Sequence, residues 1–219
     1  MRSFQLLIGF LILLFSCRTS SIPERKNLGE KYFPLELVYE LLGEGNVKYL
    51  ELHDLEFKNS DLAKLPALPE LEILSISRSN LTNLKIFTRS KYPNLYTIYA
   101  NDTAVADEDL MNWEDPPEIT KFFINSTNVS QVEWTRQFPR LRQLNLEENK
   151  IQDISALKEN RNLIEVWLGG TNVNTLDPLI GMDSLNYIGI DRLPISENDL
   201  ENFQKQMKYV KLVRRSPIF

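Results

Sequence analysis

The 219-residue sequence is poor in the residues that build covalent or metal-bound frameworks. It contains one Cys and one His. A single Cys cannot form an internal disulfide, and one Cys with one His cannot supply the three or four ligands that zinc sites use. The formal net charge is −5, so the chain has no basic field that would collect nucleic acid. We therefore expect no structural metal, no disulfide scaffold and no nucleic-acid partner.

Signatures of catalysis are equally scarce. The sequence has no phosphate loop, dinucleotide fingerprint or nucleophile motif. His53 is the only His, and no Ser or Cys lies in a motif that would make it the nucleophile of a Ser–His or Cys–His relay. Glu147 and Glu148 are adjacent, and adjacent residues of a strand point in opposite directions. We expect no enzyme activity and no cofactor. A hydrolase of envelope polymers acting through Glu147 is the weakest alternative.

The amino terminus predicts export. Arg2 precedes the uncharged run 6–15, which is the layout of a secretory signal. A helix of ten residues rises about 15 Å, half of the roughly 30 Å of bilayer hydrocarbon, so this run is too short to span a membrane permanently. We expect residues 1–16 to be a signal peptide.

Ser16 directly before Cys17 resembles the bacterial lipoprotein signal, although Phe15 departs from the small or aliphatic residue usual in that motif. The resemblance implies that Cys17 becomes the first mature residue, carries the lipid and anchors the chain to a membrane through a flexible tether, residues 17–31. Several acyl chains hold a protein on a membrane almost permanently. The implied location is the cell envelope, as an outer-membrane or cell-surface lipoprotein. The alternative is a secreted protein without lipid.

Most of the remaining chain follows one period. An apolar residue is followed by apolar residues three and five positions later, and this pattern starts anew every 24 residues at first and every 22 residues later. All eight units satisfy it, although 42% of residues are apolar and chance agreement is about 10⁻⁹. The units start at Val47, Leu71, Leu95, Ile119, Leu141, Leu163, Leu185 and Met207. Such alternation predicts a short strand with one buried face in each unit.

The unit from Leu141 to Leu157, LRQLNLEENKIQDISAL, resembles the leucine-rich repeat, and its 22-residue length resembles the internalin type of bacteria. The resemblance covers residues 47–213. It implies an α/β fold, a right-handed, curved solenoid of about eight coils with parallel strands on its concave face and short helices or 3₁₀ turns on its convex face. It also implies an inward-pointing Asn eight positions after each start, which only Asn149 satisfies.

The same pattern divides the chain into segments. We expect a capping helix in residues 32–46, repeats in residues 47–206, and a terminal strand and cap in residues 207–219. Within the repeats, the Asp-Leu pairs at 61–62, 109–110 and 199–200 predict short helices, whereas residues near Asp153 and Leu176 predict 3₁₀ turns. Trp113 and Trp134 fall on the return segments and are expected to be core residues.

Outward-pointing strand residues are the candidates for function. They lie two and four positions after each start and include many aromatics, which supply large contact area at low entropic cost. The predicted binding residues are Tyr49, Tyr99, Phe123, Asn145, Trp167 and Tyr187. We expect a protein ligand on this concave face. Two alternatives stay open: the aromatics stack on one another along the sheet, or the face binds carbohydrate or cell wall, since aromatic rings beside Gln143, Asn145 and Glu165 also suit sugars.

Overall fold

The structure is a computed structural model that describes residues 47–52 and 65–214. The expected signal peptide, the tether with Cys17, the capping helix, His53 and the last five residues lie outside the described residues.

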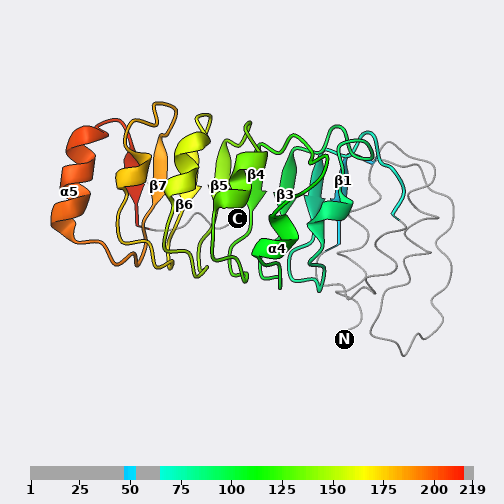
Figure 1. The fold of residues 1–219 in the computed structure, drawn as a ribbon, viewed down its shortest axis with the longest axis horizontal. Helices are drawn as coiled ribbons and strands as arrows, with labels where there is room; N and C mark the ends of the chain where they lie inside the picture. Colours follow the sequence, from blue (N-terminus) through cyan, green and yellow to red (C-terminus); the bar gives the residue numbers. More distant parts are fainter. Residues whose placement is uncertain (1–46, 53–64, 215–219) are drawn as a thin grey trace, which may run out of the picture.

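Eight parallel strands form one open sheet whose order follows the chain, as Figure 1 shows. The first seven strands lie two to four positions after the predicted starts, whereas β8 lies four to six positions after Met207, so the start of the last unit was predicted two residues too early. Paired residues are 24 apart from β1 to β4, as in Leu50 opposite Leu74, and 22 apart from β4 to β7, as in Phe122 opposite Leu144. The last pair, β7 with β8, is again 24 apart, with Ile188 opposite Leu212. The strands are β1 (Tyr49–Glu51), β2 (Ile73–Ser75), β3 (Thr97–Tyr99), β4 (Lys121–Phe123), β5 (Gln143–Asn145), β6 (Glu165–Trp167), β7 (Tyr187–Gly189) and β8 (Lys211–Val213).

The middle residue of each strand points into a core shared by neighbouring coils. Leu50, Leu144 and Ile188 belong to the same cluster of buried side chains, although they come from units far apart in the sequence. Full burial of a Leu or Ile side chain stabilises by about 1.5–3 kcal/mol, and a single coil cannot hide its own. The stability of each coil therefore depends on the coils beside it.

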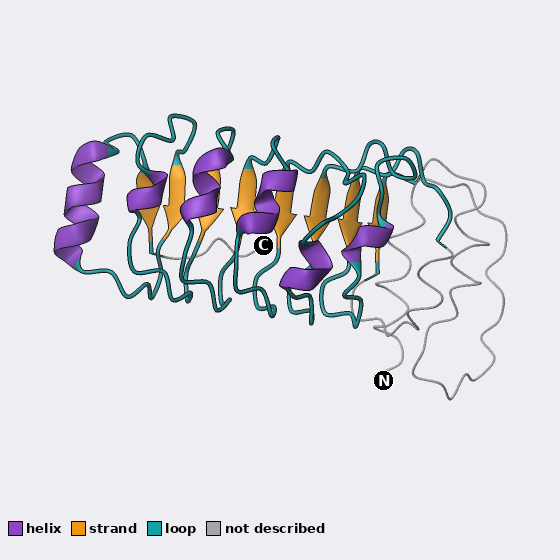
Figure 2. Cartoon of the chain, in the orientation of Figure 1, coloured by secondary structure: helices purple, strands orange, loops and turns teal. Residues whose placement is uncertain are grey.

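The return segments place every described helix on one side of the sheet (Figure 2). The Asp-Leu pairs at 109–110 and 199–200 fall in helices as expected, and the turns near Asp153 and Leu176 are 3₁₀. The pair at 61–62 lies outside the described residues. At the end of the described stack, the hydroxyl of Ser196 accepts a hydrogen bond from the Asp199 amide and caps the longest helix. The elements are η2 (Leu84–Ile86), α4 (Asp107–Leu110), η3 (Glu133–Gln137), η4 (Ser155–Glu159), η5 (Asp177–Leu179) and α5 (Glu197–Gln206).

Large aromatic side chains fill the space between the sheet and these returns. Trp134 contacts Phe122 with a ring-centroid distance of 5.3 Å, and Trp113 contacts Phe138 at 5.6 Å, both edge to face. The indole of Trp134 donates to the Gln131 carbonyl at 2.8 Å. Both tryptophans are buried, which confirms their expected place in the core.

A second ladder of hydrogen bonds follows strands β2 to β6. The residue seven positions after a start adopts a left-handed conformation, with φ between 54° and 69° at Asp102, Ser126, Glu148 and Gly170. Its amide donates to the carbonyl six positions after the next start, as in Ser126 to Glu147 at 2.9 Å. The turn therefore links each coil to the following one with a single backbone bond.

Asn149 holds the turn next to it, as the resemblance implies. Its side-chain amide donates to the carbonyls of Ile124 (2.7 Å) and Leu146 (2.9 Å), and its oxygen accepts from the amide and the hydroxyl of Thr127 (2.8 Å each). Thr171, at the same position of the next unit, instead donates its hydroxyl to the carbonyl of Leu168 within its own turn at 2.7 Å. A hydroxyl thus replaces part of the Asn network where Asn is missing.

Candidate protein-binding face

The side of the sheet opposite the helices is the candidate site. We call it the open face, because no described helix or strand lies over it (Figure 2). Two lanes of side chains run across it, from the first and the third residue of each strand. Seven strand spacings of about 4.8 Å make the face roughly 34 Å long.

The first lane is mixed in character and partly accessible. Tyr49 is 41% exposed, and Lys121, Glu165 and Tyr187 are half-buried. The ammonium of Lys211 lies 5.5 Å from the centroid of the Tyr187 ring, which is a cation–π contact. Tyrosine rings with charges of both signs beside them can contact apolar and polar groups of a ligand together.

Two aromatic rings stack in the second lane. Tyr99 and Phe123 lie on adjacent strands with centroids 4.6 Å apart and planes 9° apart. Tyr99 is half-buried, and burial raises the pKa of its phenol above the ordinary value. Phe123 is only 4% exposed. For this pair, the alternative that aromatics stack along the sheet is correct.

The indole of Trp167 lies against Gly189, its partner on the next strand. A Cβ built on Gly189 would stand 2.2 Å from Cε3 of the indole, so the ring occupies the space that a side chain would need there. Trp167 is only 6% exposed, although it lies on the open face. The core side of this strand is occupied by Val166. Sequence reasoning placed Gly189 in this lane but missed that it leaves the space for the Trp167 ring, although a Gly opposite a Trp on paired strands is the signal that could have shown it.

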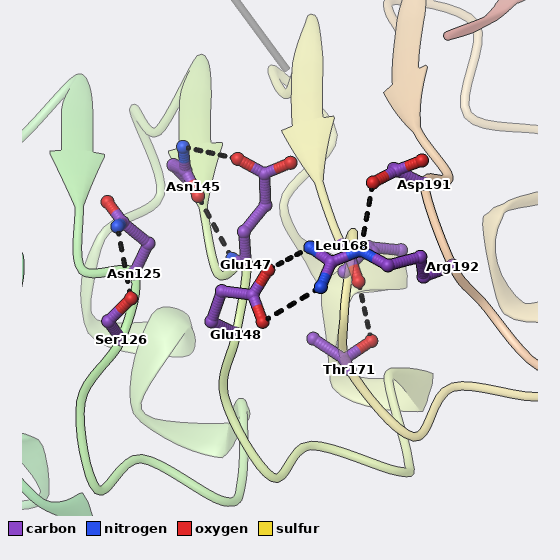
Figure 3. Close-up of polar contacts among 9 residues, drawn as sticks. All are labelled: Asn125, Ser126, Asn145, Glu147, Glu148, Leu168, Thr171, Asp191 and Arg192. Atoms are coloured by element: carbon purple, nitrogen blue, oxygen red, sulfur yellow. Dashed lines mark hydrogen bonds and ion pairs between the residues drawn. The ribbon is translucent and has the colours of Figure 1, made fainter. Parts of the chain in front are cut away.

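Asn145 completes the buried part of the lane and is 3% exposed. Its side-chain amide donates to the carboxylate of Glu147 at 3.1 Å, and its oxygen accepts from the Glu147 backbone amide at 2.9 Å (Figure 3). The expectation of exposed contact residues is therefore wrong for Phe123, Asn145 and Trp167. Ring stacking, an adjacent glycine and a local hydrogen-bond pair hold these side chains close to the sheet.

The rim of the open face carries a charged group rather than a catalytic pair. Arg192 binds the carboxylate of Glu148, and its Nε donates to Asp191 at 3.0 Å (Figure 3). The same carboxylate fills the space beside Gly170, where an added Cβ would lie 2.6 Å from Oε2. Because Glu148 is neutralised by Arg192 and Glu147 is turned toward Asn145, the two carboxylates do not share a reacting centre.

Two further properties of the described chain bear on function. No group of three or more His, Cys, Asp or Glu side chains converges to hold a metal ion within residues 47–52 and 65–214. In the same residues, no helix combines the length and apolar character needed to cross a membrane. The expected signal run lies outside this part.

No family model matches the sequence, and no curated protein matches it either. Solved structures do. An internalin of Listeria monocytogenes is similar with a TM-score of 0.64 and 16% identity, over 83% of this chain and 51% of its own. A leucine-rich-repeat protein of Leptospira interrogans gives a TM-score of 0.61 and 18% identity, over 79% and 44%. Human 5T4, also named trophoblast glycoprotein, gives 0.62 and 15%, over 84% and 72%.

These similarities establish the architecture: the chain has the leucine-rich-repeat fold. It spans about half the length of the internalin and less than half of the Leptospira protein. At 15–18% identity the likeness concerns the fold alone, and function has to be argued from the open face of this chain.

Proposed function

We propose that this leucine-rich-repeat solenoid is a non-enzymatic binding protein that holds another protein on its open face. The observation that carries the proposal is the first lane, where Tyr49, Tyr187 and their charged neighbours remain accessible on a sheet that no described helix covers. Tyr side chains bind through a large apolar ring and one hydroxyl, so they suit the centre of protein interfaces.

Tyr99 belongs to the same surface. It is the half-buried member of the second lane and lies one strand from Lys121 in the first. A ligand that contacts Tyr49 and Tyr187 crosses six strand spacings, about 29 Å. That span matches one side of a protein interface of ordinary size more closely than a small molecule.

The test removes the accessible rings and keeps the buried side chains of the second lane intact. Tyr49→Ser, Tyr99→Ser and Tyr187→Ser are combined in one variant, and the matched control is Lys158→Ser with Gln206→Ser, two exposed residues on the helix side. A partner captured from host extract or envelope extract should bind the control normally and the triple variant at least tenfold more weakly, since losing one or two interface aromatics costs about 2 kcal/mol or more. If the partner bound the triple variant and the control equally well, the open face would not be its binding site.

A glycan array probed with the parent, the triple variant and the control distinguishes carbohydrate binding from protein binding. Aromatic faces beside Gln143 and Glu165 are also compatible with sugar rings, and binding of a defined glycan that the triple variant loses would replace the protein-ligand proposal. For the protein ligand we expect no glycan signal above background.

We also propose that the chain is a lipoprotein of the cell envelope, anchored through acyl chains on Cys17. The support is the uncharged run before Ser16 and the presence of only one Cys in the chain. Cys17→Ser should move the protein from the detergent phase to the aqueous phase, because about 0.8 kcal/mol per buried methylene is lost with the acyl chains. Unchanged partitioning of the variant would leave simple secretion as the explanation.

A further inference from the structure

The two lanes of the open face contain four charged residues, Glu51, Lys121, Glu165 and Lys211. The ammonium of Lys211 contacts the Tyr187 ring, and the charges on the rim are paired with one another (Figure 3). Lys121 and Glu165 differ from these. Both are half-buried, and within residues 47–52 and 65–214 their side chains form neither a hydrogen bond nor an ion pair.

A neutral residue separates these two charges. Lys121 pairs with Gln143 across β4 and β5, and Gln143 pairs with Glu165 across β5 and β6. The order along the first lane is therefore positive, neutral, negative, with the two charges two strand spacings apart, about 10 Å. A half-buried charge loses part of its hydration, so a ligand that brings an opposite charge to it is favoured.

This order of charges is complementary to itself. A twofold axis parallel to β5, in front of Gln143, would set the open face of a second copy against the first. Lys121 would then face Glu165 of the second copy, and Glu165 would face its Lys121. An axis over β4 would instead set Lys121 against itself, and an axis over β6 would do the same to Glu165. The axis over β5, the middle strand of β2 to β8, is the one that pairs both charges.

We propose that the open face binds a second copy of this chain in this arrangement, with two Lys121–Glu165 ion pairs in each dimer. The inference rests on the proposed function, which places a protein ligand on the open face, and it names that ligand.

The half-buried tyrosines fit the same register. Tyr187 and Thr97 lie in the first lane at equal distances from β5, on β7 and β3, so the axis sets the Tyr187 ring opposite a short side chain. In the second lane the same symmetry sets Tyr99 opposite Gly189. Rings thus face positions of small volume, as close packing of two surfaces requires. An interface two lanes wide is smaller than the usual 800 Å² or so per partner, so we expect dissociation in the micromolar range.

Exchanging the two charges tests the arrangement. All proteins are full chains with Cys17→Ser, which removes the proposed acyl chains and the only Cys. Sedimentation velocity should show a monomer–dimer equilibrium for this parent. Lys121→Glu and Glu165→Lys should each raise the dissociation constant at least tenfold, because each sets like charges opposite one another twice per dimer. Lys121→Glu combined with Glu165→Lys should restore it to within about threefold of the parent.

The double exchange keeps the net charge of the parent, so its recovery would come from the pairing and not from the overall charge. The matched control is Lys158→Glu with Glu201→Lys, two exposed residues on the helix side, which should leave the equilibrium unchanged. Far-UV circular dichroism of each variant verifies that the solenoid is folded.

Cross-linking locates the axis. Gln143 would face Gln143 of the second copy, and stacked sheets lie about 10 Å apart. Gln143→Cys should therefore give a covalent dimer with a short bismaleimide, whereas Lys158→Cys should not.

A parent that stays monomeric throughout the micromolar range would overturn the inference, as would single variants that dimerise like the parent or a double exchange that stays as weak as the singles. Failure of Gln143→Cys to cross-link would reject the axis over β5. Each of these results would leave the proposed function standing if an extract still yields a different protein that the triple Tyr variant loses. If no protein is lost by that variant and the parent is monomeric, both fail.

Discussion

Replacing Gly189 by Ala tests the packing of the open face directly. The new Cβ would lie 2.2 Å from Cε3 of Trp167, whereas carbon atoms in contact are normally about 3.5–4.0 Å apart. The indole must therefore move by more than 1 Å or the strand must shift. Extra atoms in a well-packed site cost about 1–3 kcal/mol. Ala also restricts the unfolded chain, which offsets about 0.4–1 kcal/mol.

We therefore expect Gly189→Ala to lower the free energy of unfolding by about 1–2 kcal/mol, as the difference of these two effects. Urea denaturation of the folded protein measures it. The decisive comparison is the same substitution in a Trp167→Ala background, where the overlap no longer exists. There Gly189→Ala should be neutral or slightly stabilising, which gives a coupling of at least about 1 kcal/mol between the two sites.

Gly181→Ala supplies the matched control. Gly181 has φ +81° and no atom within 4 Å of an added Cβ, so its cost comes from backbone strain alone, about 1–2 kcal/mol. This cost should be the same in both Trp167 backgrounds. If Gly189→Ala also cost the same in both, the claim that the indole fills the glycine's space would be refuted.

The remaining predictions concern turns and return segments. Asn149→Ala should destabilise by about 3 kcal/mol in urea, because it removes the side-chain partner of the Leu146 carbonyl and of the Thr127 amide and one of the two donors to the Ile124 carbonyl. Asn160→Ala should cost about 2 kcal/mol in the same assay, because the buried Asn160 amide donates to two carbonyls of the preceding coil at 3.0 and 3.2 Å. Asp153→Ala should cost less than either, through loss of the 2.8 Å bond from the Ser155 amide. Hydrogen bonds from Ser155 lower the pKa of Asp153, so its contribution is complete above the unfolded carboxyl pKa of about 3.9 and disappears as pH falls through the lower folded value.

Each of these has a distinguishing control. Asn149→Asp keeps the oxygen acceptor but loses the donor, so it should be at least as harmful as Asn149→Ala at pH 7 and less so in acid. The gap in stability between Asp153→Ala and the parent should be constant from pH 7 to about 5 and should narrow only below about 4. A gap that stays constant down to the acid transition would argue against a role for the ionised carboxylate.

The architecture could be predicted because burial imposes it on every coil. An apolar residue at positions three and five of each unit suffices to specify a strand with one inward face, and a constant spacing specifies the parallel register. Leu74 and Leu144 occupy these positions in the structure as the period predicts. The change from 24 to 22 residues was equally visible, since the returns are the only place where the chain can shorten without moving a strand.

Exposure on the open face could not be predicted in the same way. Alternation tells which side of the sheet a residue faces, and it correctly places Phe123 and Trp167 opposite the core. How far each is covered depends on its neighbours across strands: Tyr99 for the first and Gly189 for the second. Asn160 was missed because its partners are carbonyls of another coil, which no local pattern contains.

The left-handed turn residues give the molecule an unusual freedom in length. Each links its coil to the next through one backbone amide and one carbonyl, and Arg78, Asp102, Ser126 and Gly170 all perform this role with different side chains. Excising or duplicating a complete unit would therefore rejoin equivalent donors and acceptors. Evolution can lengthen or shorten such a protein in whole steps of about 5 Å and so adjust the footprint it offers to a ligand, without inventing a new kind of junction.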